Sequence, residues 1–354
     1  MRLSVCLKAP LAVLSLAVFL AACAPVVQPA GPGLDRTSAP AMVAGTGAAE
    51  VFVTGDGTRL PLRRWLPEGE PRAVVLALHG FGDTGNAFAM PAPRFTADGV
   101  AVYAYDQRGF GGSPHHGRWP GVDRLIGDAR DAVSLLRARH PGTPLYVMGE
   151  SMGATILLAA LTGEGAPEVD GAILLAAAVW SADRMPWLYR ATLWFAAHTI
   201  PWYPLSGQGL KIIPTDNPEA LRRLRADPQV IKQPRVDLID GLVRAMGVGV
   251  RDAPAFDVPA LIAYGLRDEI IRPDPMRATL DTLPKPPEGK WRLAIYPEGY
   301  HLLLRDLQAN RVIDDILAWT RDRGAPLPSG ADWQSMRRLH GQPVEPFAPP
   351  AAMR

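Results

Sequence analysis

A five-residue pattern near the middle of the chain, Gly149-Glu150-Ser151-Met152-Gly153, restricts the possible folds more than any other feature. It follows an apolar run over residues 144–148, which predicts a buried strand, and precedes a second run over residues 154–160, which predicts a buried helix. Gly-x-Ser-x-Gly at a strand-to-helix turn is the nucleophile elbow, which exposes the serine hydroxyl at the helix N-terminus. We therefore predict that Ser151 is a catalytic nucleophile.

The chain also supplies partners for this serine in a characteristic order. A serine hydroxyl is a weak nucleophile, so a neutral histidine must take its proton and a carboxylate must orient that histidine. Asp268 follows an apolar strand pattern over residues 258–265, and His301 follows the next such pattern. Ser, then Asp, then His, each just past a strand, is the order of α/β-hydrolases. We predict Asp268 as the acid and His301 as the base, with Glu269 and Asp274 as alternatives for the acid.

A glycine-containing loop is the candidate for binding negative charge. The apolar strand predicted over residues 72–78 is followed by His79-Gly80-Phe81-Gly82. A developing oxyanion needs two backbone N–H donors that already point at it. We predict that Phe81 and Met152 supply them. His79 is expected to shape this loop by hydrogen bonding and not to act as a second base.

Four blocks give the chain a resemblance to the α/β-hydrolase superfamily, and within it to the monoacylglycerol lipase and lysophospholipase group (serine aminopeptidase S33-type hydrolases). The blocks are residues 79–82, 105–113, 149–153 and 299–301. The resemblance covers about residues 51–323. It implies the α/β-hydrolase fold, the nucleophile, acid and base roles of Ser151, Asp268 and His301, and oxyanion donors at Phe81 and Met152. The chain departs from the mammalian lipase type at Glu150, where that type has histidine, and in the segment after Trp180.

The alternation of strand and helix patterns predicts the architecture. Residues 50–177 and 258–323 alternate in this way, which predicts an α/β core with a mostly parallel sheet and helices on both faces. Ligands bind at the carboxyl ends of the strands in such sheets. Residues 178–257 interrupt the alternation, and we interpret them as an inserted helical cap.

The cap is rich in aromatic residues, of which Trp180, Trp187 and Trp194 are candidate substrate-binding residues. The alternative is that these side chains only pack the cap onto the core. The two ends of the chain are rich in Pro, Gly and Ala. They predict a flexible tether over residues 23–49 and a loosely ordered tail over residues 324–354.

The N-terminus has the three parts of a secretory signal peptide, predicted over residues 1–22: positive charge, an uncharged apolar run, and Leu-Ala-Ala before Cys23. The apolar run is shorter than the roughly 20 residues of a transmembrane helix. Its ending resembles the lipobox of bacterial lipoproteins, which implies that Cys23 is lipid-modified. Because the only other cysteine, Cys6, lies in the signal, no disulfide is expected in the mature chain. The expected location is the cell envelope, and Ala24 favours the outer membrane, facing the periplasm.

Composition excludes several other classes. The formal net charge is +2 and no basic run suggests nucleic acid. No Cys/His cluster has metal-ligand spacing and no glycine-rich phosphate loop is present, so we expect neither a metal nor a cofactor. The predicted function is hydrolysis of carboxylic esters through an acyl-enzyme, with monoacylglycerols or lysophospholipids as the substrates that the resemblance implies. An envelope acyltransferase, an aminopeptidase and a non-catalytic binding module are the alternatives.

Overall fold

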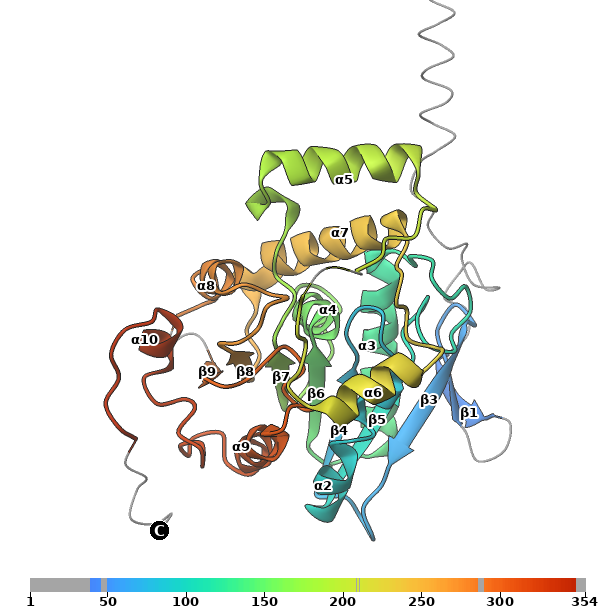
Figure 1. The fold of residues 1–354 in the computed structure, drawn as a ribbon. Helices are drawn as coiled ribbons and strands as arrows, with labels where there is room; N and C mark the ends of the chain where they lie inside the picture. Colours follow the sequence, from blue (N-terminus) through green and yellow to red (C-terminus); the bar gives the residue numbers. More distant parts are fainter. Residues whose placement is uncertain (1–38, 46–49, 208, 210, 286–289, 348–354) are drawn as a thin grey trace, which may run out of the picture.

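A nine-stranded sheet forms the centre of the molecule, with the order β1-β2-β3-β5-β4-β6-β7-β8-β9 (Figure 1). The computed structural model describes residues 39–45, 50–207, 209, 211–285 and 290–347. The predicted signal peptide, Cys23 and most of the predicted tether lie outside these residues. The strands are β1 (Ala41–Ala44), β2 (Glu50–Val53), β3 (Arg59–Trp65), β4 (Ala73–Leu78), β5 (Val100–Tyr105), β6 (Leu145–Glu150), β7 (Gly171–Leu175), β8 (Ala260–Gly265) and β9 (Trp291–Tyr296).

The direction of the strands follows from their sequence patterns. Every residue of β4, β5, β6, β7 and β8 is buried. These near-continuous apolar runs are typical of parallel strands that are covered on both faces. They pair in parallel with one another and with β9, whereas β1, β2 and β3 form an antiparallel edge. The prediction of a mostly parallel α/β sheet is confirmed.

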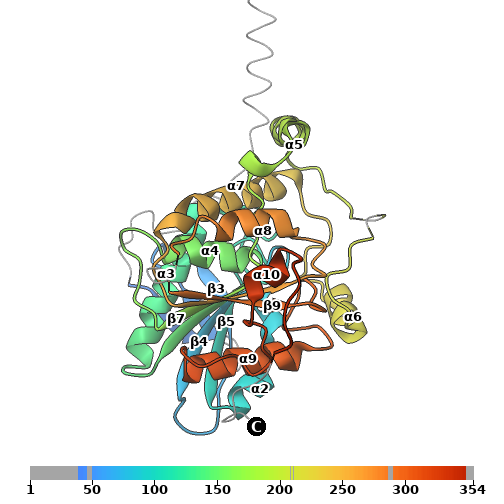
Figure 2. The same ribbon diagram turned by 90° about the vertical axis from the view of Figure 1, so that its left-hand side faces the viewer.

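Helices cover both faces of the sheet and form a three-layered core (Figure 2). One apolar cluster packs α3, α4 and α8 on one face, and a second packs η1, α2 and α9 on the other. These core elements and the last helix are η1 (Gly85–Phe88), α2 (Ala92–Ala97), α3 (Val122–Arg139), α4 (Met152–Ala160), α8 (Pro273–Leu280), α9 (Ala309–Arg321) and α10 (Ser335–Leu339). Within the part of the chain that the structure describes, no helix is both long and apolar enough to span a membrane.

A helical segment lies between β7 and β8, where the cap is predicted. Its elements are η2 (Ala182–Arg184), α5 (Trp187–Thr199), α6 (Pro218–Ala226), α7 (Val236–Asp252) and η3 (Ala253–Ala255). Helix α7 packs on α4 at Gly249, where an added Cβ would stand 2.7 Å from Thr155 Cγ2. Helix α5 lies beyond α7, farthest from the sheet (Figure 1).

Backbone hydrogen bonds fasten the cap over the carboxyl ends of the strands. The Ile231 amide donates to the Gly82 carbonyl at 2.8 Å, and the Leu302 amide donates to the Pro214 carbonyl at 3.0 Å. Gly82 and Leu302 belong to loops that follow β4 and β9. The cap is thereby joined to two of the loops in which the sequence places candidate site residues.

Both predicted flexible ends are partly incorporated into the core, and those two predictions need correction. Residues 41–44 of the predicted tether form β1, which pairs with β2. In the predicted loose tail, Leu327 and Leu339 are buried, and the Ile295 amide of β9 donates to the Ala331 carbonyl at 2.8 Å. A few apolar residues and backbone pairings outweigh a composition rich in Pro and Gly. Residues 348–354 of the predicted tail lie outside the described residues.

Candidate active site

The turn between β6 and α4 holds Ser151 in a conformation that side chains rarely adopt, with φ of 55° and ψ of −115°. Its two glycines are required by close packing. An added Cβ would stand 2.4 Å from the Ala154 nitrogen at Gly149, and 2.2 Å from the Leu78 oxygen at Gly153. Because both distances are well below van der Waals contact, only glycine lets the strand and the helix pass this closely.

His301 and Asp268 form a buried hydrogen-bonded pair. The Nδ1 of His301 donates to the Oδ2 of Asp268 at 2.8 Å. The other carboxylate oxygen accepts from the amides of Ile270 and Ile271, each at 2.8 Å. A carboxylate fixed on both oxygens holds the imidazole in one orientation, with Nε2 left for a proton from a nucleophile.

Two glycines bring the loops of this pair together. An added Cβ on Gly265 would stand 2.2 Å from the Gly299 oxygen, and the Arg267 amide donates to that same oxygen at 2.9 Å. The loop after β8 therefore lies directly against the loop after β9. Asp268 reaches His301 because the backbones of these two loops are in contact.

The alternative acids have other partners. The carboxylate of Glu269 accepts from the amide of Ile213 in the cap at 2.8 Å. Asp274 lies in the first turn of α8, where its carboxylate pairs with Arg277 at 3.0 Å. Of the three candidate acids, Asp268 is the one that the structure places on His301.

The loop after β4 lies beside the nucleophile. An added Cβ on Gly80 would stand 3.3 Å from the Cβ of Ser151 and 3.9 Å from its Oγ. Phe81 comes next, and its ring packs edge-on against Phe110 with the centroids 5.6 Å apart. Met152 is the first residue of α4. The predicted oxyanion donors therefore come from two segments that meet at Ser151.

His79 shapes this loop through hydrogen bonds, in the manner that the sequence predicts. Its Nδ1 donates to the Gly80 carbonyl at 2.8 Å, and its Nε2 accepts from the Gln107 amide at 3.0 Å. This pattern requires the neutral imidazole, and burial lowers the pKa of His79 accordingly. With both ring nitrogens occupied, His79 is not available as a base.

The block over residues 105–113 holds the loop after β4 in place through hydrogen bonds and ion pairs. Asp106 accepts from the amides of Gly85 at 2.7 Å and Gly112 at 2.8 Å. Arg108 is buried and pairs with Asp128 at 2.6 Å and with Asp56 at 2.7 Å. These contacts tie the block to the loop after β4, to α3 and to the hairpin of β2 and β3. The block builds the scaffold on which the oxyanion loop rests.

Ser151 and His301 both line one cavity of about 360 Å³. Most of its wall is apolar and comes from the cap and the loops after β4, β8 and β9. The apolar lining residues are Phe81, Ala178, Trp180, Pro214, Leu224, Val230, Ile231, Leu242, Met246, Ile270, Ile271 and Leu302. Such a wall suits a hydrocarbon chain, with the reacting group held at Ser151.

The cap tryptophans predicted to bind substrate divide into two groups. Trp180 lines the cavity. Trp187 and Trp194 do not, since they lie on the outer helix α5 with 74% and 54% of their surfaces exposed, and Trp194 stacks on His198. Both assignments are therefore corrected. Besides Trp180, the cap reaches the cavity through residues around α6 and on α7 that were not predicted to bind substrate: Pro214, Leu224, Val230, Ile231, Leu242 and Met246.

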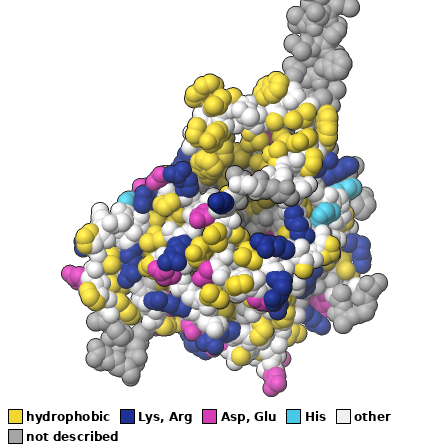
Figure 3. Space-filling view, viewed as in Figure 1, with side chains coloured by type: hydrophobic (Ala, Val, Ile, Leu, Met, Phe, Trp, Pro, Cys, Tyr) yellow, Lys and Arg dark blue, Asp and Glu magenta, His cyan; other side chains and the backbone are white. Residues whose placement is uncertain are grey.

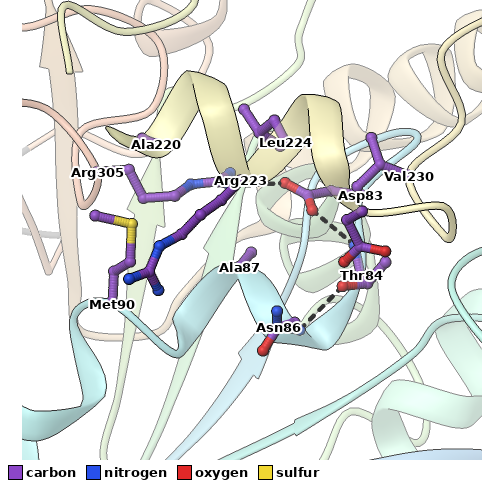
Figure 4. Close-up of a pocket in the computed structure, with 11 residues that line it drawn as sticks. Asp83, Thr84, Asn86, Ala87, Met90, Ala220, Arg223, Leu224, Val230 and Arg305 are labelled. Atoms are coloured by element: carbon purple, nitrogen blue, oxygen red, sulfur yellow. Dashed lines mark hydrogen bonds and ion pairs between the residues drawn. The ribbon is translucent and has the colours of Figure 1, made fainter. Parts of the chain in front are cut away.

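A charged cluster at the polar end of the cavity was also missed. The guanidinium of Arg305 pairs with Asp83 at 2.8 Å and with Glu150 at 2.5 Å. Figure 4 shows the Asp83–Arg305 pair, which also borders a smaller pocket beneath α6. Burial raises the pKa of Glu150, and Arg305 opposes that rise. A charged residue inside the elbow pattern, directly before Ser151, was the available signal.

The chain is similar to proteins described as lipases and esterases. The family model described as serine aminopeptidase, S33, matches residues 69–308. A monoacylglycerol lipase of Mycolicibacterium smegmatis is 29% identical over 290 residues, which are 78% of this chain and 98% of that protein. Human monoglyceride lipase is 26% identical over 292 residues, 77% of this chain and 90% of that protein. A soluble variant of Saccharomyces cerevisiae monoglyceride lipase, solved with a substrate analog, has a TM-score of 0.63 at 20% identity, covering 84% of this chain and 99% of that one.

Proposed function

Because this chain belongs to the serine aminopeptidase S33 family, we propose that it is a serine hydrolase that cleaves esters of the monoacylglycerol type. The observation that carries the proposal is the His301–Asp268 hydrogen bond at the wall of the cavity that also contains the strained Ser151. The relatives named as monoacylglycerol or monoglyceride lipases support the substrate class.

We assign the following roles, which this geometry supports. Ser151 Oγ attacks the ester carbonyl while His301 Nε2 takes the serine proton. Asp268 orients His301 and stabilises its charged form. The amides of Phe81 and Met152 donate to the oxyanion, and His301 then protonates the leaving alcohol. A water molecule, deprotonated by His301, attacks the acyl-enzyme and releases the fatty acid. No metal or cofactor takes part in this sequence of steps.

The substrate class also follows from the cavity. Its apolar wall fits an acyl chain, and its polar end, at Glu150 and Arg305, lies beside the reacting atoms. A monoacylglycerol has this division between a long apolar chain and a small polar alcohol. A lysophospholipid has the same acyl part with a larger head group.

The test compares the protein with its Ser151→Ala variant on p-nitrophenyl esters of increasing chain length and on a monoacylglycerol. We expect hydrolysis by the native protein, with a loss of at least about 10³-fold in the variant. Products formed with added glycerol distinguish hydrolysis from acyl transfer. Inertness toward a serine-directed phosphonate, in a folded protein, would instead support a non-catalytic binding module. Cleavage of aminoacyl amides without cleavage of esters would support an aminopeptidase.

We also propose that the enzyme is a bacterial lipoprotein, anchored through Cys23 to the cell envelope and placed at the outer membrane, facing the periplasm. The signal-like residues 1–22 and the position of Cys23 support this proposal. The exposed apolar face of the cap is compatible with work at a lipid surface (Figure 3). Its large exposed side chains are Trp187, Leu188, Tyr189, Trp194, Phe195, Ile200, Trp202, Tyr203 and Leu205.

A further inference from the structure

A buried cluster of three charges connects the loops that carry the proposed chemistry. Asp83, Glu150 and Arg305 are 8%, 1% and 4% exposed. Arg305 Nη1 donates to Asp83 Oδ2 at 2.8 Å, and Nη2 donates to Glu150 Oε2 at 2.5 Å. Figure 4 shows Arg305 extending toward Asp83 from the opposite side of the smaller pocket.

Each member of the cluster lies at or after the carboxyl end of a different strand. Asp83 follows the oxyanion loop, Glu150 directly precedes Ser151, and Arg305 lies four residues after His301. One guanidinium therefore joins the segments that hold the donors, the nucleophile and the base. The fixed fork of arginine binds two carboxylates at once, which the single ammonium of lysine does less well.

The cluster contains two carboxyl groups and one guanidinium. The Oε1 of Glu150 is buried and has no hydrogen-bond partner among the described residues. Burial raises the pKa of Glu150, whereas Arg305 and His301 lower it and Asp83 raises it. Burial raises the pKa of Asp306, on the histidine loop, and the charge of Glu150 raises it further. Asp268 contacts His301 directly, and Glu150 lines the same cavity as His301 and Ser151.

We propose that Asp83, Glu150 and Arg305 are positioning residues, in which Arg305 holds the three catalytic loops together and Glu150 stabilises the protonated form of His301 during the reaction. The inference rests on the proposed function, because that function gives His301 and Ser151 their roles. Removing one partner of a buried ion pair strongly lowers stability, so the catalytic role of the cluster is measured from the kinetics of the folded protein.

The decisive variant is Glu150→Gln, which keeps the shape of the side chain and removes its charge. The free enzyme needs neutral His301, so kcat/KM falls on the acid side as His301 becomes protonated. Without the nearby negative charge the protonated form of His301 is less stable. The acid limb of the pH profile of kcat/KM therefore moves to lower pH by about one unit. For the same reason we expect kcat on the plateau to fall about tenfold, with KM changed less than about threefold.

Asp83→Asn is the matched control, because it removes the other carboxylate from the same guanidinium. Asp83 follows the oxyanion loop and does not border Ser151 or His301 in the sequence, so we expect a lower kcat without the full shift of the acid limb. Glu150→Asp keeps the charge and should restore the native acid limb. Arg305→Lys should lower kcat, because a lysine ammonium pairs less well with Asp83 and Glu150 at the same time.

Rates are expressed per active site titrated with a fluorophosphonate, so that loss of folded protein does not count as loss of catalysis. The proposal is overturned if Glu150→Gln leaves the acid limb in place, or if Asp83→Asn moves it equally far. The rate at which the fluorophosphonate reacts with Ser151, measured as a function of pH, reports the activation of the serine by His301 without an ester substrate. A native protein that is phosphonylated but cleaves no ester would contradict the proposed function, while these variants would still test the cluster.

Discussion

At the scale of single residues, the structure concentrates backbone strain at the proposed nucleophile. Ser151 has a φ of 55°. Its amide donates to the Leu175 carbonyl at 2.9 Å, and its carbonyl accepts from the Ala178 amide at 3.1 Å. These bonds to neighbouring segments keep the residue in a conformation that costs on the order of 1–3 kcal/mol. The strain is the physical consequence of presenting a hydroxyl at the end of a buried strand.

This strain predicts that Ser151→Gly is more stable than the native protein, although inactive. Glycine tolerates this conformation, so the free energy of unfolding should rise by about 1 kcal/mol. Thermal unfolding monitored by circular dichroism measures the difference as a Tm increase of about 2–4 °C. Ser151→Ala is the control, since alanine keeps the strained Cβ and should not gain stability. Equal Tm values for the two variants would show that the turn is not strained.

At the scale of elements, the two long cap helices differ in what they face. Helix α7 packs on α4 and lines the cavity through Leu242 and Met246. Helix α5 has Ala197 as its one buried residue and presents its aromatic side chains outward. Of these two helices, α7 is therefore the one that can contact an acyl chain in the cavity.

We accordingly predict that Leu242→Trp reduces hydrolysis of long-chain esters relative to short-chain esters. The indole fills part of the cavity, and the long-to-short ratio of kcat/KM should fall about tenfold. Trp194→Ala is the matched control on α5 and should leave this ratio within about twofold. The p-nitrophenyl ester series measures both ratios. If Trp194→Ala alone lowered the long-to-short ratio of kcat/KM, the acyl chain would bind at α5 and not at α7.

At the scale of the whole molecule, the apolar cap surface and the proposed lipid anchor are both suited to a membrane surface. The cavity lies beneath the cap, and the outer cap surface carries the exposed aromatic residues. Several acyl chains on one cysteine would hold a protein stably on a membrane, since each buried CH₂ contributes about 0.8 kcal/mol. The enzyme would then meet lipid esters at the surface where they reside.

Replacing Cys23 by Ser in the full-length chain should release the protein from the membrane fraction of a bacterium that processes lipoproteins. The native protein should need detergent for extraction, because its acyl chains are buried in the bilayer. Cys6→Ser is the matched control, since Cys6 lies within the predicted signal, and it should leave the distribution unchanged. Retention of the Cys23→Ser variant in washed membranes would contradict lipid anchoring and point to the cap surface.

Local sequence patterns were enough for the fold and for the order of the candidate residues. Strands β4 and β8 are apolar throughout and β6 is apolar up to Met148, which predicts parallel strands before any contact is known. Ser151, Asp268 and His301 each follow such a strand, so the parallel sheet gathers them at one edge. These features depend on residues close together in the chain, and the sequence by itself therefore determined them.

Contacts between side chains that are distant in the sequence depend on tertiary packing. The Arg305 cluster joins residues more than 150 positions apart, and no local pattern records such a contact. The face of the cap that meets the cavity depends on how α7 packs on α4, so Trp187 and Trp194 could not be separated from Trp180 by composition. The packing of Leu327 and Leu339 likewise depends on surfaces formed elsewhere in the chain. Burial is a property of the assembled core, whereas periodicity is a property of the segment.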